Sequence, residues 1–186
     1  MELSSRALRR IALAVAMAFA LAATAQAQQP PPVTRTDDGL SRIELATGFV
    51  FTWKIVDEHI EATVSAPTTG WVAIGFNPVN RMQGATYVIG YVQGSDVAIR
   101  HDWGTSPTSH RDVVAAGGVS RVTALGGKEE GGRTEISFRL PLDPGDRFFS
   151  PIRPGAVNTV IWAFGPNGAD NFTSIHRQLG SFAVTF

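Results

Sequence analysis

The stretch Ile60-Glu61-Ala62-Thr63-Val64-Ser65 decides the fold class of this chain. Apolar and polar side chains alternate along it, and successive side chains of a β-strand point to opposite faces of the sheet. An alternation with a period of two therefore predicts a strand with one buried face and one face toward solvent. Residues 135–140, Glu-Ile-Ser-Phe-Arg-Leu, repeat this pattern far along the chain.

Further short apolar runs lie on both sides of these two segments, with glycine- and proline-containing turns between them. Many short strands separated in this way are typical of an antiparallel β-sandwich or barrel, so one all-β domain is predicted. Residues 105–118 are predicted to be a long connection, with or without a helical turn. The other strand candidates are residues 49–56, 71–76, 85–92, 97–101, 119–125, 157–164 and 181–186.

The first 27 residues have the three parts of an export signal. Basic Arg6, Arg9 and Arg10 precede an apolar run over residues 11–23, and Ala25-Gln26-Ala27 has the small-x-small pattern of a cleavage site. The apolar run is short for a membrane span, so cleavage is favoured over anchoring. The signal peptide (1–27) predicts a periplasmic or secreted protein, with the twin-arginine and general export routes both open.

Cleavage would leave a proline-rich leader (28–39) and one domain (40–186), with no membrane span in the mature chain. The full chain carries 16 basic and 16 acidic residues, and removing 1–27 leaves a small acidic excess. A basic patch with interleaved aromatic residues is missing from the sequence, which argues against binding to nucleic acid. No G-x-S-x-G nucleophile motif occurs either.

The sequence contains no cysteine, and this excludes several kinds of site. Disulfide frameworks, thiolate zinc sites, cysteine-ligated iron–sulfur clusters and blue-copper sites all need cysteine. Covalent haem attachment through C-x-x-C-H also needs it. Any haem in this protein is therefore expected to be haem b, held without a covalent link.

After the signal peptide the chain keeps one methionine, Met82, in the loop Gly75-Phe76-Asn77-Pro78-Val79-Asn80-Arg81-Met82-Gln83-Gly84-Ala85. A thioether is a soft metal ligand, and a Met/His pair is one way to hold haem iron. Filling a gap in the core is the alternative role for such a methionine. His176 is the candidate partner, whereas His59 and His110 are expected to be solvated and His101 to make a structural hydrogen bond.

Several segments together resemble the DOMON family, and the resemblance covers residues 40–186. Its best marks are the Gly-Trp-x-x-x-Gly-Phe opening and the methionine that follows it. The matching segments are Gly70-Trp71-Val72-Ala73-Ile74-Gly75-Phe76-Asn77, Met82-Gln83-Gly84-Ala85, residues 87–91, Val160-Ile161-Trp162-Ala163-Phe164, His176 and Gly180.

The resemblance implies an immunoglobulin-like antiparallel β-sandwich that binds either haem b or a sugar-like ligand. In haem-binding members a methionine after the Gly-Phe strand and a histidine near the C-terminus hold the iron, and Met82 and His176 match those positions. We therefore expect these two residues to come together across one end of the sandwich. With both axial positions filled, the protein would be an electron carrier and not an enzyme.

Other residues acquire expected roles beside this pair. Arg81 and Arg177 each adjoin a proposed ligand, and we expect them to pair with the haem propionates. Phe76, Tyr87 and Phe164 are expected to line the walls of the haem pocket. The expected partner is a redox protein or a dehydrogenase subunit. The alternatives are a haem-free module that binds a sugar or another small ligand, and an interaction subunit of a larger redox complex.

Overall fold

The computed structural model describes residues 29–186, so the predicted signal peptide lies outside the described residues. These residues form twelve strands in two antiparallel sheets of six. The first sheet has the order β1 (Thr34–Arg35), β2 (Ser41–Glu44), β3 (Val50–Val56), β4 (His59–Ala66), β10 (Arg133–Pro141), β9 (Thr123–Glu130). The second has the order β12 (Gln178–Thr185), β11 (Val157–Phe164), β5 (Val72–Phe76), β6 (Thr86–Gln93), β7 (Asp96–Ser106), β8 (Ser109–Asp112).

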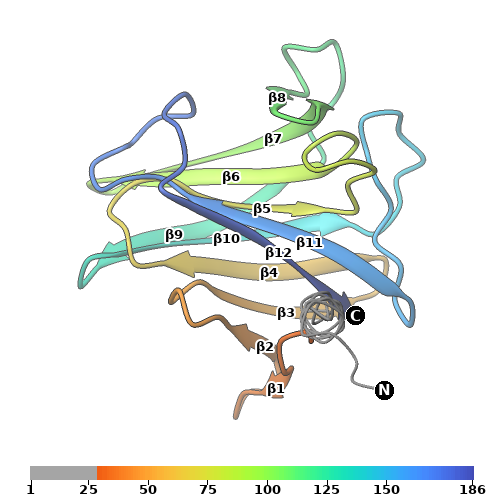
Figure 1. Cartoon of the computed structure of the whole chain (residues 1–186), viewed down its shortest axis with the longest axis horizontal. Helices are drawn as coiled ribbons and strands as arrows, with labels where there is room; N and C mark the ends of the chain where they lie inside the picture. The colour runs from red at the N-terminus through yellow and green to blue at the C-terminus, as the bar shows by residue number, and fades with distance from the viewer. Residues whose placement is uncertain (1–28) are drawn as a thin grey trace, which may run out of the picture.

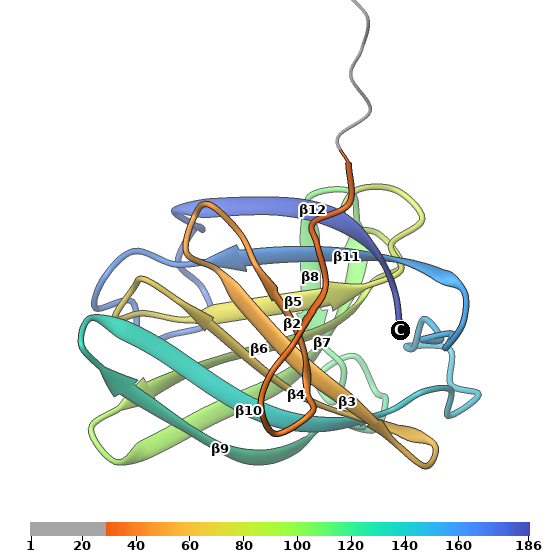
Figure 2. The same cartoon turned by 90° about the horizontal axis from the view of Figure 1, so that it is seen from below.

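The two sheets stack face to face, as Figures 1 and 2 show from two directions. The predicted all-β antiparallel sandwich is therefore confirmed, and the described part of the chain contains no helix. Residues 29–186 therefore include no helix that is long and apolar enough to cross a membrane.

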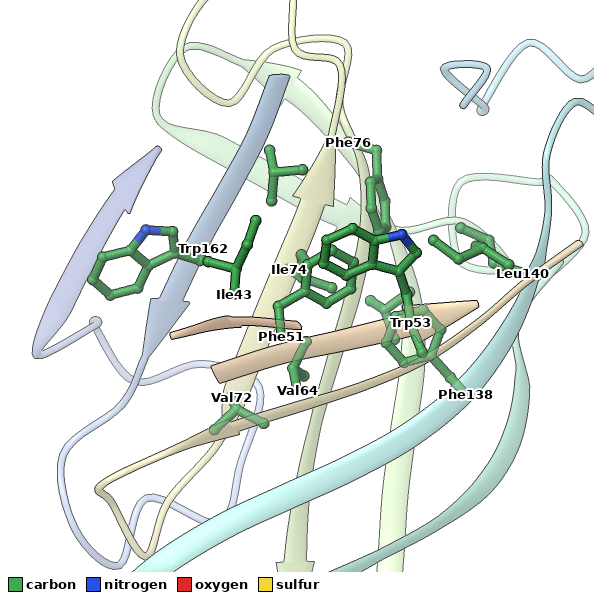
Figure 3. Close-up of a cluster of buried hydrophobic side chains, with 14 of the residues drawn as sticks. Ile43, Phe51, Trp53, Val64, Val72, Ile74, Phe76, Phe138, Leu140 and Trp162 are labelled. Carbon is green, nitrogen blue, oxygen red and sulfur yellow. The ribbon is translucent and has the colours of Figure 1, made fainter. Parts of the chain in front are cut away.

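The core lies between the sheets and follows the alternation read from the sequence. In β4 the side chains of Ile60, Ala62 and Val64 are buried, while Glu61 and Thr63 are partly exposed. Aromatic side chains fill much of the remaining space (Figure 3). The Phe51 and Trp53 rings, for example, stack with their centroids 4.6 Å apart. This burial of apolar surface is the main term that holds the sandwich together.

Strand β5 is buried on both of its faces. Val72, Ile74 and Phe76 point into the core, whereas Ala73 belongs to a second, smaller apolar cluster. That cluster also contains Trp71, Ile89 and Ala169. Because Ala169 lies in the β11–β12 connection, this connection covers the outer face of the second sheet beside β5.

Three segments differ from the sequence-based expectations. Strands β1 and β2 were not predicted, and β1 falls within the expected leader (28–39), where it pairs with β2. The expected long connection over 105–118 contains the end of β7 and all of β8, which form a hairpin. Strand β9 begins and ends later than the expected strand over residues 119–125, with Gly126-Gly127 inside it at a register shift, and the turn to β10 falls at Gly131-Gly132, both with positive φ. Pairing with β10 extends β9 through two glycines that have low intrinsic strand propensity.

Candidate functional site

A pocket of about 310 Å³ lies on the outer face of the second sheet. Small and apolar side chains from four strands form its floor, and residues from three connections border it. Its volume is at the lower end of the range of small-molecule sites, and its largely apolar lining is also typical of them. The lining residues are Ala73, Arg81, Met82, Tyr87, Pro107, Thr108, Ile161, Trp162, Ala163, His176, Leu179, Gly180 and Ser181.

The floor is shaped by a glycine beneath an aromatic ring. A Cβ atom on Gly75 would lie 2.7 Å from Cε1 of Tyr87 and 2.8 Å from Cγ1 of Ile161, so a larger residue would displace the tyrosine. Tyr87 is 7% exposed, and its hydroxyl has no hydrogen-bond partner within residues 29–186. Burial, with a smaller contribution from Asp102, raises the pKa of the Tyr87 phenol. The hydroxyl therefore remains protonated and keeps an unused hydrogen-bond donor.

Met82 lies in the β5–β6 connection, which is fastened to strand β7. Gly84 N donates to Gly104 O at 2.8 Å, and Gly104 N donates to Ala85 O at 3.0 Å. Met82 N also donates to Pro107 O at 3.4 Å, at the turn between β7 and β8. The backbone of the methionine is thus held by neighbouring main chain, and its partly buried side chain lines the pocket.

The close approach at Gly104 makes a testable prediction. A Cβ atom there would lie 1.8 Å from Met82 O, a backbone atom that cannot turn aside. Gly104→Ala should lower the free energy of unfolding by roughly 1–3 kcal/mol, as overpacking usually does, and should shift the Met82 methyl resonance in an NMR spectrum.

Gly94→Ala provides the control for this prediction. Gly94 has a φ of +63° and open space around its missing Cβ, so alanine adds backbone strain without a collision. The Met82 resonance should stay in place in this variant. An unshifted Met82 resonance in Gly104→Ala would contradict the contact.

His176 lies in the β11–β12 connection. A backbone hydrogen bond joins the two ends of this connection, and side-chain hydrogen bonds to Asn171 stabilise a turn within it. Arg177 N donates to Phe164 O at 2.8 Å. Asn171 Oδ1 accepts hydrogen bonds from Thr173 N at 2.9 Å and Ser174 N at 2.8 Å. His176 is exposed, and it lines the same pocket as Met82.

The two connections leave the second sheet at opposite ends. Strands β5 and β11 are antiparallel neighbours, so the connection after β5 and the connection after β11 begin at opposite edges of the sheet (Figures 1 and 2). The expectation that Met82 and His176 meet across one end of the sandwich is therefore wrong about the place. Both residues instead line one pocket over the outer face of the sheet.

The other expected site residues divide into two groups. Arg81 and Tyr87 line the pocket, while Arg177 is exposed and lies outside the lining. Phe76 and Phe164 are 0% and 2% exposed and lie in the core between the sheets. They do not wall the pocket, because each occupies a core-facing position of a strand whose neighbouring residues face outward.

A buried carboxylate beside the pocket was not predicted from the sequence. The side chain of Asp102 is fully buried; Arg100 Nε and Nη2 donate to its two oxygens at 2.5 and 2.6 Å. His110 Nδ1 lies 2.5 Å from Asp102 Oδ2, so the expectation that His110 is solvated is wrong. Burial opposes the charged carboxylate, but the hydrogen bonds from His110 and Arg100 outweigh it and lower the pKa of Asp102.

The spacing of Arg100 and Asp102 was the available signal for this cluster. Residues two apart in a strand share a face, so opposite charges at these positions are placed to pair. His110 reaches the carboxylate only because the β7–β8 hairpin, which the sequence did not reveal, folds back on β7.

His101 faces the opposite side of β7 and serves the fold. Its Nδ1 accepts a hydrogen bond from Arg121 N at 3.1 Å, as expected for a structural histidine. Its ring is 2% exposed, and Nε2 finds no partner in the described part of the chain. Burial lowers the pKa of His101 to about 4, although Asp102, Asp146 and Asp112 act in the opposite direction. His59, at the start of β4, lies 3.3 Å from Arg139 Nη2.

Comparison with known proteins identifies a matching family model and solved structures with a similar fold. A family model, the DOMON domain, matches residues 46–165. The cytochrome b domain of pyranose dehydrogenase from Coprinopsis cinerea has a TM-score of 0.61 and 16% identity, over 83% of this chain and 87% of that chain. The cytochrome domain of cellobiose dehydrogenase from Myriococcum thermophilum has a TM-score of 0.57 and 12% identity, over 83% and 86%. No curated protein sequence matches this chain.

Proposed function

Because this chain belongs to the DOMON family, we propose that it is an exported b-type cytochrome that carries single electrons, with haem held between Met82 and His176. The observation that carries the proposal is that both residues line one apolar pocket on the outer face of the second sheet. The similarity in fold to two cytochrome domains supports it.

The residues of the pocket fit a non-covalently held haem. One soft sulfur and one imidazole nitrogen are a donor set that haem iron accepts at its two axial positions. The connections that carry them start from opposite ends of the sheet, so Met82 and His176 would hold the haem from two separate segments of the chain. The floor is largely apolar, and Ala73 and Ala163 contribute only small side chains to it.

When bound, haem supplies a one-electron couple between the ferric and ferrous states. Met82 and His176 would both hold the haem, and the chemistry it would supply is then electron transfer without binding of oxygen or a substrate. As a ligand, the thioether of Met82 would favour the ferrous state and raise the potential. Leu179 and Ile161 keep the pocket apolar, which limits the access of water.

Polar groups at the edge of the pocket would orient the haem. Arg81 lines the pocket and would pair with a propionate, since guanidinium and carboxylate form strong charge-assisted bonds. Arg177, exposed beside His176, would meet the other propionate only at the surface.

The electron partners are proposed to be proteins outside the cytoplasm, either a separate redox protein or a dehydrogenase subunit. Export rests on the basic, apolar and Ala-x-Ala pattern of residues 1–27. A carrier with both axial positions filled needs a partner for each electron that it accepts and donates. The expected role is therefore transfer between proteins, without catalysis.

A visible spectrum of the protein titrated with haemin tests the proposed function. The oxidised and reduced spectra should show a low-spin, six-coordinate b-type haem at one equivalent, and acid with organic solvent should extract it. The His59→Ala variant should give the same spectrum, because His59 lies on the first sheet, away from the pocket. Protein that stays colourless would replace this function with the haem-free, ligand-binding alternative.

A further inference from the structure

The connection that carries His176 contains one aromatic side chain, Phe172, which packs down onto the sheet. Its ring centroid lies 5.0 Å from that of Tyr91 on β6. On β7, the guanidinium carbon of Arg100 lies 4.3 Å from the Phe172 centroid, within the distance of a cation–π contact. Phe172 also packs against the apolar cluster that contains Ala73, a residue of the pocket floor.

Arg100 is not free to move in this contact. Its Nε and Nη2 both donate to Asp102, and this two-point contact fixes the plane of the guanidinium. Asp102 is itself fixed, because its side chain is fully buried and His110 occupies the remaining side of Oδ2. The arginine therefore presents one oriented face to the Phe172 ring. Because Asp102 already fixes the guanidinium, forming this contact costs less side-chain conformational entropy than it would for a mobile arginine.

Phe172 lies four residues before His176 in the chain. Asn171, the residue before Phe172, accepts hydrogen bonds at Oδ1 from the backbone N–H groups of Thr173 and Ser174, which makes this turn compact. After His176, Arg177 N donates to Phe164 O. His176 is thus carried by a short segment fixed on both sides, although its own side chain is exposed.

From this arrangement we infer that Asp102 and Arg100 are positioning residues for His176, acting through Phe172. The buried carboxylate orients the guanidinium, the guanidinium holds the Phe172 ring on the sheet, and the ring sets where the connection places the imidazole. The expected effect on haem affinity rests on the proposed function. The immobilisation of the β11–β12 connection by Phe172 does not depend on haem.

The Phe172→Leu variant tests the inference because leucine keeps an apolar contact and removes the aromatic face. Phe148→Leu is the matched control: the guanidinium carbon of Arg147 lies 4.4 Å from that ring, in the segment between β10 and β11. Phe172→Trp is the conservative variant, since tryptophan offers the best face for a cation. All three use the full mature chain.

In haem-free protein, hydrogen exchange at Thr173, Ser174 and Arg177 should be roughly 10-fold faster in Phe172→Leu, the factor expected for losing one cation–π contact. Phe172→Trp and Phe148→Leu should exchange like the native protein. With haem, Phe172→Leu should bind roughly 10-fold more weakly and lose part of its six-coordinate spectrum, while Phe148→Leu binds normally.

The two parts of the experiment separate the possible failures. Unchanged exchange in Phe172→Leu would overturn the positioning role, whether or not the protein binds haem. Equal loss of haem affinity in Phe172→Leu and Phe148→Leu would also overturn it, because the effect would then be a general loss of stability. Native protein that fails to bind haem, with exchange in Phe172→Leu still accelerated, would overturn the proposed function and leave the positioning of the connection supported.

Discussion

Replacement of His176 by alanine should remove most of the bound haem from the protein. The imidazole is the stronger of the two proposed axial donors, and no other described histidine lines the pocket to replace it. Loss of a direct ligand should exceed the roughly 10- to 100-fold loss of affinity that follows removal of an outer-shell partner. Haem titration followed by visible absorption measures the effect directly.

Met82→His separates ligation from general damage to the pocket. Imidazole can replace the thioether, so this variant should keep a six-coordinate haem but have a lower reduction potential, because the potential-raising methionine is lost. A spectroelectrochemical titration measures the shift. A Met82→Ala, His176→Ala double variant that keeps the native spectrum would exclude this pair as the haem ligands.

Acidification from pH 7 to pH 4 should lower the free energy of unfolding by about 3 kcal/mol through His101 alone. Its pKa is about 4 in the folded protein against an ordinary value of 6.5, and burial is the main cause. The unfolded chain therefore binds more protons between these values, so stability is complete above pH 6.5 and is lost as the pH falls toward 4. Asp102 loses its contribution only below its ordinary value of 3.8.

Urea unfolding at a series of pH values measures this loss. Protonated His101 can no longer accept the hydrogen bond from Arg121 N, which holds the segment between β8 and β9. A His101→Gln variant should show a flatter dependence of stability on pH between 6.5 and 4, even if it is less stable throughout. An equal slope in the native protein and the variant would assign the acid sensitivity to other groups.

The alternation of apolar and polar residues was sufficient to predict the β-sandwich. Segments such as β4 and β10 have one face in the core, and burial imposes the period of two on their sequences. Strand β9 carries no such pattern, because it is an edge strand with largely exposed side chains and depends on pairing with β10. Strand β1, with two exposed residues, leaves no sequence signal at all.

Four of the residues singled out in the sequence, Arg81, Met82, Tyr87 and His176, line one pocket, but the arrangement of that pocket was not predictable. The rarity of methionine and the resemblance to a known family pointed to Met82 and His176. The sequence did not show that Phe76 and Phe164 face the core. Strand β5 is buried on both faces, and the second half of β11 has apolar residues on both faces, so hydrophobicity alone does not distinguish the core face from the outer face. The Asp102–His110 pair depends on a hairpin that bulges at Gly104, and single-residue patterns do not encode that register.

The order of strands in the second sheet has a consequence for how the protein matures. Strand β5 pairs with β6, its neighbour in sequence, but also with β11, from which strands β6 to β10 separate it along the chain. Such distant pairings form slowly, because the entropy of closing a long loop is lost before the stabilising contacts between the strands form. A pocket bordered by residues from both regions exists only after that closure. Haem would thus bind only after the last stage of folding. The molar ratio of haem to protein in a preparation would then measure the fraction of molecules that have completed folding.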